Sequence, residues 1–180
     1  MLDISLETDA QEERAVAAQL RDLLARFDTS RYWWTNRVRI AAGELPHSHP
    51  VLTVGTRQYD NEHMLLADFI HEQLHWYLDE RDEQCSAAMS DVRRRFPAVP
   101  AGYPDGARDE TSTYLHLVLC PLEHVALTDL LGDAAADRVR AFWQQDHYRW
   151  IYQTVEDDWQ YLSAMLQRHE LLPIALASPR

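Results

Sequence analysis

Residues 64–78 read Met-Leu-Leu-Ala-Asp-Phe-Ile-His-Glu-Gln-Leu-His-Trp-Tyr-Leu, an apolar run interrupted by few charged side chains. Asp60 and Asn61 precede this run as candidate N-caps, and Glu62 follows them in the first turn, where a carboxylate is favourable. The pattern predicts a long helix over residues 61–78. The rest of the fold is inferred outward from this helix.

On the N-terminal side, the sequence predicts a helix followed by a small sheet. Thr8 followed by Gln11 fits a capping box, and apolar residues then recur at helical spacing, which predicts a helix over residues 9–27. Residues 37–41 alternate polar and apolar side chains, and residues 50–56 form a second run rich in β-branched residues. Glycine and proline between these two runs mark a turn, so we expect two or three strands of a small sheet.

On the C-terminal side, further helices are expected. One spans residues 82–96 and is stopped by Pro97, and a loop rich in proline and glycine follows over residues 98–109. The chain then becomes apolar again as far as Leu131.

Pro121 interrupts this second apolar stretch, over residues 111–131, so either one helix is kinked there or a new helix starts with proline at its first position. Gly132 ends the stretch. Asp133 can cap the last helical region, which runs to about Arg168 in one or two pieces.

These elements predict an α+β fold: a mostly helical single domain over residues 1–180, with a small N-terminal sheet packed on the helix of residues 61–78. The formal net charge is −12, from 29 acidic against 17 basic residues. A field of this sign repels nucleic acid and anionic membrane surfaces, so neither is an expected partner. The run Arg93-Arg94-Arg95 is interpreted as a solvated face or a partner of the helix dipole.

Several features favour a cytoplasmic protein. No apolar stretch approaches the 18 or so residues that would span a bilayer. The acidic N-terminal segment lacks the charged and apolar regions of a secretory signal peptide. Cys85 and Cys120 lack CxxC spacing, which fits two reduced thiols, although one disulfide between them is compatible with the sequence.

His71, Glu72 and His75 form the pattern HExxH. Residues four apart on a helix lie one turn apart on the same face, so both imidazoles can bind one zinc ion at about 2.0–2.1 Å. Glu72 is rotated away from the two ligands, which keeps it off the metal and lets it reach a metal-activated water as general base. Buried histidines without partners would be costly in such an apolar helix, which favours metal binding over two packed histidines.

On these residues the chain resembles the zincin metallopeptidases, which carry HExxH on an active-site helix beside a small sheet. The resemblance covers residues 61–78 directly. It implies that His71 and His75 bind zinc and that Glu72 is the general base and acid of peptide hydrolysis. The strand-like run of residues 51–56 is similar in placement to the edge strand that aligns peptide substrates in such enzymes.

The branch of the family is constrained by the residues that follow the motif. Leu78 and Arg81 stand where another branch has Gly and a third His, so that branch is excluded. The glutamate-zincin branch takes its third ligand from a later helix. Glu123 is the preferred candidate, because a lone carboxylate in an apolar segment would be destabilising unless paired or metal-bound; an ion pair with an arginine is the equal alternative. Glu110 and His116 remain alternative ligands, Glu110 more plausibly as a helix N-terminal residue.

His116 is also a candidate catalytic residue, as a donor to the oxyanion that develops during hydrolysis. Two aspartates that flank the motif, Asp68 and Asp79, are weaker candidates, which could orient a ligand imidazole. On the last helical region, His147, Tyr148 and Tyr152 could donate hydrogen bonds, but such a group is more often packed in the core.

The leading hypothesis is therefore a zinc-dependent metallopeptidase acting on a peptide or protein substrate. The alternative is a catalytically inactive zincin-like module that binds metal or regulates another protein. An exposed strand edge beside the zinc favours the enzyme, and a blocked edge favours the module.

Overall fold

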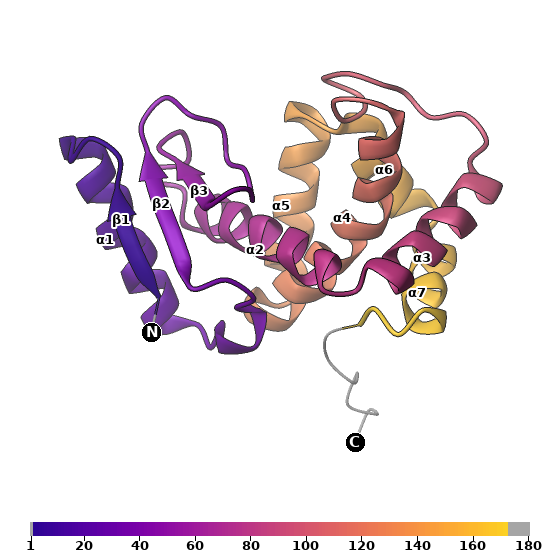
Figure 1. The fold of residues 1–180 in the computed structure, drawn as a ribbon, viewed down its shortest axis with the longest axis horizontal. Coiled ribbons are helices and arrows are strands. Elements are labelled where there is room, and N and C mark those ends of the chain that lie inside the picture. The colour runs from indigo at the N-terminus through magenta and orange to yellow at the C-terminus, as the bar shows by residue number, and fades with distance from the viewer. Residues whose placement is uncertain (1, 173–180) are drawn as a thin grey trace. The chain divides into compact units, whose positions relative to one another are not determined.

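The computed structural model describes residues 2–172. Within that range the chain is mostly helical and carries one small sheet of three parallel strands, which confirms the expected α+β class (Figure 1). The chain divides into two compact units, Met1–Tyr77 and Leu78–Arg180. The expectation of a single domain stays a prediction.

The sheet of the first unit has the order β1-β2-β3, with β1 at Asp3–Leu6, β2 at Arg37–Ala41 and β3 at Leu52–Gly55. Its register aligns apolar residues in rows across the strands: Ile4, Val38 and Leu52 in one, Leu6, Ile40 and Val54 in the next. The strands predicted near residues 37–41 and 50–56 are confirmed. The third strand is β1, whose four residues are too short and too polar to stand out from the sequence.

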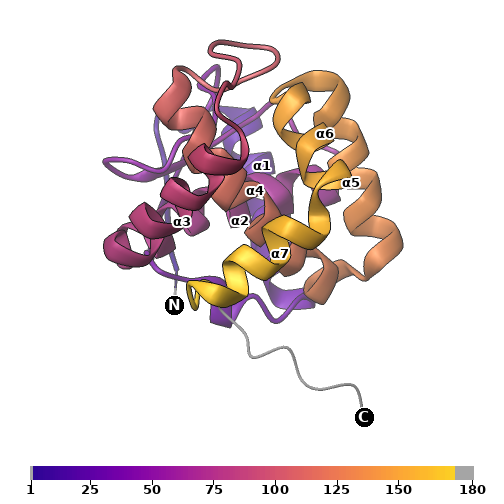
Figure 2. The same ribbon diagram turned by 90° about the vertical axis from the view of Figure 1, so that its right-hand side faces the viewer.

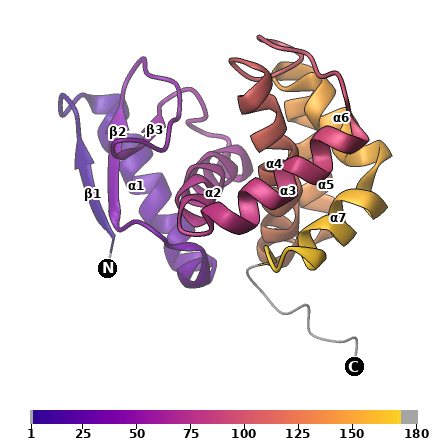
Figure 3. The same ribbon diagram turned by 45° about the vertical axis from the view of Figure 1, so that its right-hand side comes forward.

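Helix α1 (Gln11–Arg26) confirms the helix predicted over residues 9–27 and packs against β1 and β2 (Figure 3). The predicted capping box of Thr8 and Gln11 is wrong. The buried carboxylate of Glu13 instead accepts hydrogen bonds from the backbone N–H groups of Thr8 and Ala10, at 2.9 and 3.3 Å. Its other oxygen accepts from Ala42 N at 3.0 Å, just after β2, so the same side chain caps the helix and joins it to the sheet.

A short 3-10 helix at Ser30–Tyr32 follows α1. Helix α2 (Glu62–Asp79) then confirms the long helix predicted over residues 61–78. Its side chains contact the loops that lead into β2 and β3: Gln73 hydrogen-bonds with Trp34 and Thr35, and the Trp76 indole donates to the Ser48 carbonyl at 2.9 Å. The sheet and the HExxH helix are therefore connected, as the sequence led us to expect.

The regular elements of the second unit are all helices in the part that the structure describes, with α4 at the centre (Figure 2). The other helices of the unit pack around α4. The bounds of these helices and of α4 are α3 Asp82–Arg95, α4 Glu110–Leu131, α5 Asp133–Asp146, α6 Arg149–Asp157 and α7 Trp159–Arg168. Pro121 lies inside α4, which stays one helix. Two expectations were wrong: Gly132 rather than Asp133 is the N-cap of α5, and the last helical region forms three helices.

Helix α4 also corrects the expectation that no segment is long and apolar enough to cross a bilayer. By length and composition, its 22 residues are sufficient to cross a bilayer, with a mean hydropathy of 1.2 in the most apolar window. However, 61% of that window is buried inside the protein, and a core helix meets the same criteria. The central position of α4 in its unit explains its apolar composition.

Candidate metal centre

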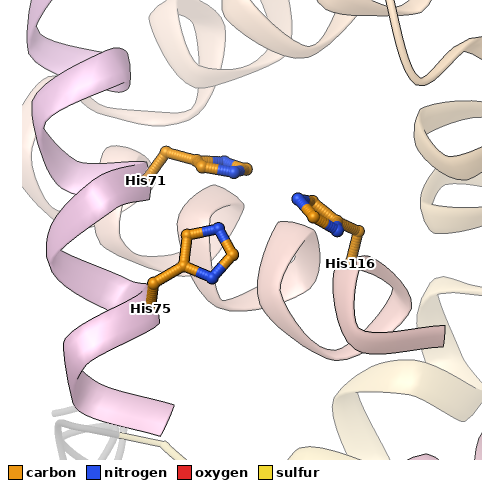
Figure 4. A group of neighbouring side chains, drawn as sticks. All are labelled: His71, His75 and His116. Atoms are coloured by element: carbon orange, nitrogen blue, oxygen red, sulfur yellow. The ribbon is translucent and has the colours of Figure 1, made fainter. Parts of the chain in front are cut away.

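Two imidazoles project from the same side of α2, at His71 and His75 (Figure 4). Their ring centroids are 5.2 Å apart with an interplanar angle of 68°, and a nitrogen of each ring lies within 4.8 Å of the other. Two nitrogen ligands of one tetrahedral zinc ion are about 3.4 Å apart, given Zn–N distances of about 2.0–2.1 Å. Modest ring rotations therefore suffice for both histidines to bind the same ion.

The rotation of α2 about its axis is fixed by Gln73, which is fully buried. Its side-chain oxygen accepts hydrogen bonds from Trp34 N and Thr35 N, at 2.8 and 3.0 Å, and its side-chain nitrogen donates to Thr35 O at 2.9 Å. Position 73 lies about 200° around the helix from position 71, and position 75 about 200° beyond it. Because Gln73 is held against the loop before β2, His71 and His75 are turned to the opposite side of α2.

Glu72 stands beside the two histidines, about 100° around the helix from His71. Its side chain is buried, with 6% of its surface exposed. A carboxylate in this position is offset from the line of the two imidazoles, so it can serve as a base next to a metal rather than as a ligand in line with them. The geometry of α2 thus provides the arrangement that the motif predicts.

In the second unit, His116 projects from α4 (Figure 4) and is 5% exposed. Its Nδ1 lies 2.7 Å from the backbone carbonyl oxygen of Ser112, one turn earlier. A carbonyl only accepts hydrogen bonds, so Nδ1 carries the proton and Nε2 of the neutral ring keeps its lone pair. Metal-binding histidines commonly have their second nitrogen held in this way, because it fixes the tautomer and the ring direction. His116 is therefore prepared to act as a ligand through Nε2.

Cys120 and Glu123 lie on the same face of α4 as His116, at positions four and seven residues further on. Both are buried, and a Glu123 carboxylate oxygen lies within 4.8 Å of Cys120 Sγ. The Tyr152 hydroxyl, from α6, donates to Glu123 Oε2 at 2.9 Å. The carboxylate that the sequence singled out thus has a hydrogen-bond donor that the sequence could not identify.

Burial governs the electrostatics of this group. It raises the pKa of the Cys120 thiol well above its usual range, and the Glu123 charge adds to the effect. Burial also raises the pKa of Tyr152 well above its usual range, with Cys120 and Glu123 contributing. Both groups therefore stay protonated at neutral pH, which makes Cys120 a poor nucleophile. Cys85 and Cys120 are both free.

Next to His116 lies a group of aromatic side chains. The Tyr148 ring is 4.5 Å from the His116 ring, and its hydroxyl is 3.2 Å from that of Tyr103. Tyr148 has a left-handed backbone with φ of 53°, which is unfavourable for a bulky residue and is found mostly where the surrounding structure imposes it. His147 packs against Trp143 at 4.8 Å, in agreement with the interpretation of that histidine as packed among aromatic residues.

The other sequence candidates are placed as follows. Glu110 is the exposed first residue of α4, beside the N-cap Asp109, whose carboxylate accepts from Ser112 N at 2.7 Å. This confirms its interpretation as a helix N-terminal residue. Asp68 is partly buried in α2, and Asp79 is exposed at its end. Their proposed role in orienting a ligand imidazole stays a prediction.

Strand β3 lies at the edge of the sheet, as expected from its resemblance to a substrate-aligning strand, but its outer side is covered. His47 pairs with Thr53 in an antiparallel bridge, with His47 N to Thr53 O at 3.1 Å and Thr53 N to His47 O at 2.8 Å. A methyl group added to Gly55 would lie 2.4 Å from Glu44 O. Residues 44–49, called here the edge segment, therefore lie along the outer side of β3 and occupy its backbone groups at Thr53.

The edge segment is held at both ends. Arg39 binds the Glu44 carboxylate at 2.8 Å and the Thr53 hydroxyl at 3.2 Å. At the other end, the His49 ring stacks on Trp76 with centroids 4.1 Å apart. These contacts place the segment on β3 in the folded first unit, and they connect it to the residue that directly follows His75.

No known protein-family model matches the chain, and no curated protein or solved structure is significantly similar to it.

Proposed function

We propose that this protein is a zinc-dependent hydrolase of peptide bonds, in which His71 and His75 bind the metal and Glu72 is the general base. The observation that carries the proposal is the face of α2 opposite Gln73, where two imidazole nitrogens lie within 4.8 Å of each other with a buried carboxylate beside them. Imidazole nitrogens are preferred zinc donors, so the donor set fits this ion.

The proposal takes its third ligand from α4, and the chemistry there favours His116 over Glu123. The Nδ1 hydrogen of His116 is donated to the Ser112 carbonyl, and metal-binding histidines commonly have their second nitrogen held in this way. Glu123 accepts a hydrogen bond from Tyr152, which can also orient a ligating carboxylate, so Glu123 is kept as the alternative. We therefore assign His116 as the ligand and Glu123 as the alternative.

Each residue has a role in the proposed reaction. A zinc ion in this site supplies a Lewis acid, which polarises the scissile carbonyl and acidifies a water molecule. Glu72 accepts the proton of the attacking water and returns it to the leaving amine. If Glu123 rather than His116 completes the ligand set, His116 takes the role first expected of it, as a hydrogen-bond donor to the oxyanion.

The test combines metal analysis with hydrolysis of a peptide library. The purified protein should contain one zinc ion per chain, and Glu72→Gln should retain it while losing hydrolysis by about 100-fold or more. Glu80→Gln is the matched control, because Glu80 is exposed just beyond α2 and should change neither property. Loss of zinc from the Glu72 variant, or equal activity in all three proteins, would contradict the assignment of Glu72.

The third ligand is tested separately. His116→Ala should weaken zinc affinity by more than tenfold, whereas Glu123→Gln should leave it within a few-fold of the parent. The reverse result would make Glu123 the ligand. Zinc affinity unaffected by either change would refute a ligand from α4.

A second candidate function is a catalytically inactive module that binds metal, and the edge segment favours it. A peptidase that aligns its substrate by strand addition needs the outer side of β3, and His47 already occupies it at Thr53. The module predicts stoichiometric zinc with no hydrolysis of any peptide in the library by the parent protein. The enzyme predicts hydrolysis that Glu72→Gln removes.

A further inference from the structure

The sequence predicts that the run Arg93-Arg94-Arg95 is a solvated face. In the structure, another arginine, Arg168, lies close to this run. Arg94 and Arg95 lie in the last turn of α3, and Arg168 is the last residue of α7. Together with Asp91 and Tyr161 they line a cavity of about 350 Å³ in the second unit, called here the arginine pocket. Its volume is at the lower end of the range of about 300–1,000 Å³ found for small-ligand sites.

The floor of the arginine pocket is Asp91, which is 8% exposed. Its carboxylate accepts hydrogen bonds from Arg94, from Arg168 at 2.6 Å and from His169 at 2.9 Å. The Tyr161 hydroxyl donates to the Asp91 backbone carbonyl at 2.9 Å. Asp91 therefore holds two guanidinium groups from different helices in fixed positions.

The charges in this pocket do not balance. Its lining contains three arginines and one aspartate, and with Asp158, which pairs with Arg95, counted as well, the formal charge is +1 in a chain whose net charge is −12. Outside the lining, Asp158 pairs with Arg95 at 2.7 Å, and His169 can add a positive charge when protonated. One cation would neutralise the Asp91 carboxylate, but this carboxylate accepts hydrogen bonds from two arginines and a histidine.

The guanidinium groups also keep unused donors. Each carries five N–H groups, and the contacts to Asp91 and Asp158 use only a few of them. The side chains of Arg94, Arg95 and Arg168 are 72%, 52% and 55% exposed, so their remaining donors are accessible to a ligand. The carbonyl ends of α3 and α7 help these cations to gather, but a helix dipole does not satisfy hydrogen-bond donors at the far end of a side chain.

We propose that the arginine pocket binds a phosphate group, either free or as the phosphomonoester of a small molecule. A phosphate anion offsets the remaining positive charge, and its several oxygens can accept from three guanidinium groups at once, whereas a carboxylate has only two oxygens. Arg94 and Arg168 are oriented by Asp91, and Arg95 by Asp158, so little side-chain freedom is lost on binding. This site is independent of the HExxH helix and of the proposed hydrolysis.

The test is calorimetric titration of the full-length protein with inorganic phosphate and with phenyl phosphate, at constant ionic strength set by sodium chloride. We expect one site per chain, and an affinity about tenfold or more weaker in Arg94→Gln. Arg93→Gln is the matched control, since it removes the same charge from the same run but belongs to a side chain packed over Tyr114, outside the pocket lining. Phosphate held by zinc would respond equally to the two changes.

If Arg94→Gln lowers the thermal stability, Arg95→Gln serves as a second variant, because Arg95 donates its hydrogen bond to Asp158 and not to the buried Asp91. Binding of both probes assigns the site to the phosphate group itself, and binding of phenyl phosphate alone assigns it to a phosphomonoester. Absence of saturable binding of either probe, equal affinity for acetate, or equal loss in the Arg93 and Arg94 variants would overturn the proposal.

Discussion

Replacing Gln73 by alanine is expected to destabilise the first unit and to weaken the proposed metal site together. The change removes three hydrogen bonds and leaves Trp34 N, Thr35 N and Thr35 O without their side-chain partner. At about 1 kcal/mol for each bond the loss is about 3 kcal/mol, and a fully buried position cannot recover it easily through water. For a protein of this size that corresponds to a fall in Tm of about 6–12 °C.

The measurement is urea unfolding followed by tryptophan fluorescence, with Gln160→Ala as the control because Gln160 is exposed on α7. The control should change the free energy of unfolding by less than about 0.5 kcal/mol. Under conditions where Gln73→Ala remains folded, its zinc affinity should also fall, since the Gln73 hydrogen bonds hold the rotation of the HExxH face about the α2 axis. A loss below about 1 kcal/mol, with unchanged zinc affinity, would refute the reasoning that Gln73 orients α2.

Three further expectations concern packing and buried polar groups. Tyr152→Phe should cost about 1.5–3 kcal/mol by urea unfolding, because the buried Glu123 carboxylate loses a donor at 2.9 Å; a cost near zero would mean that this bond contributes nothing. Gly55→Ala should cost about 1–3 kcal/mol and increase proteolysis of the edge segment, because the new methyl group meets Glu44 O; unchanged cleavage would place the segment elsewhere. Burial lowers the pKa of His124, so its proton is taken up first by the unfolded chain and stability falls as pH drops below about 6.5; His124→Gln should flatten the dependence between pH 7 and 5, and an unchanged slope would contradict this.

Most helices could be predicted because their patterns are local. Helices α1, α2 and α3 were expected within one or two residues of their observed bounds, since apolar spacing and stop residues such as Pro97 act within a turn or two. Strand β1 was missed because a four-residue strand acquires its identity from the partner with which it pairs, 34 residues away at Ile4 and Val38. The division of the last region into three helices depends on Tyr148 and Asp158, neither of which is a standard helix breaker.

The candidate site shows the same division. His71, Glu72 and His75 were identified because helical geometry converts their spacing directly into a shared face. Gln73 does not stand out in the sequence, because nothing in its neighbours reveals that Trp34 and Thr35 lie beside it. The covering of β3 by residues 44–49 was equally hidden, since the sequence shows a strand but not which side of it is occupied.

The sequence by itself therefore determined the helical face that carries two imidazoles and a carboxylate, because that arrangement repeats within one turn of a regular backbone. Only the tertiary structure decided in which direction that face is turned, through the buried Gln73. It also brought Arg168 beside Arg94 around Asp91. The physical reason is that hydrogen bonds and ion pairs between distant segments depend on how the chain packs, and no local spacing encodes that.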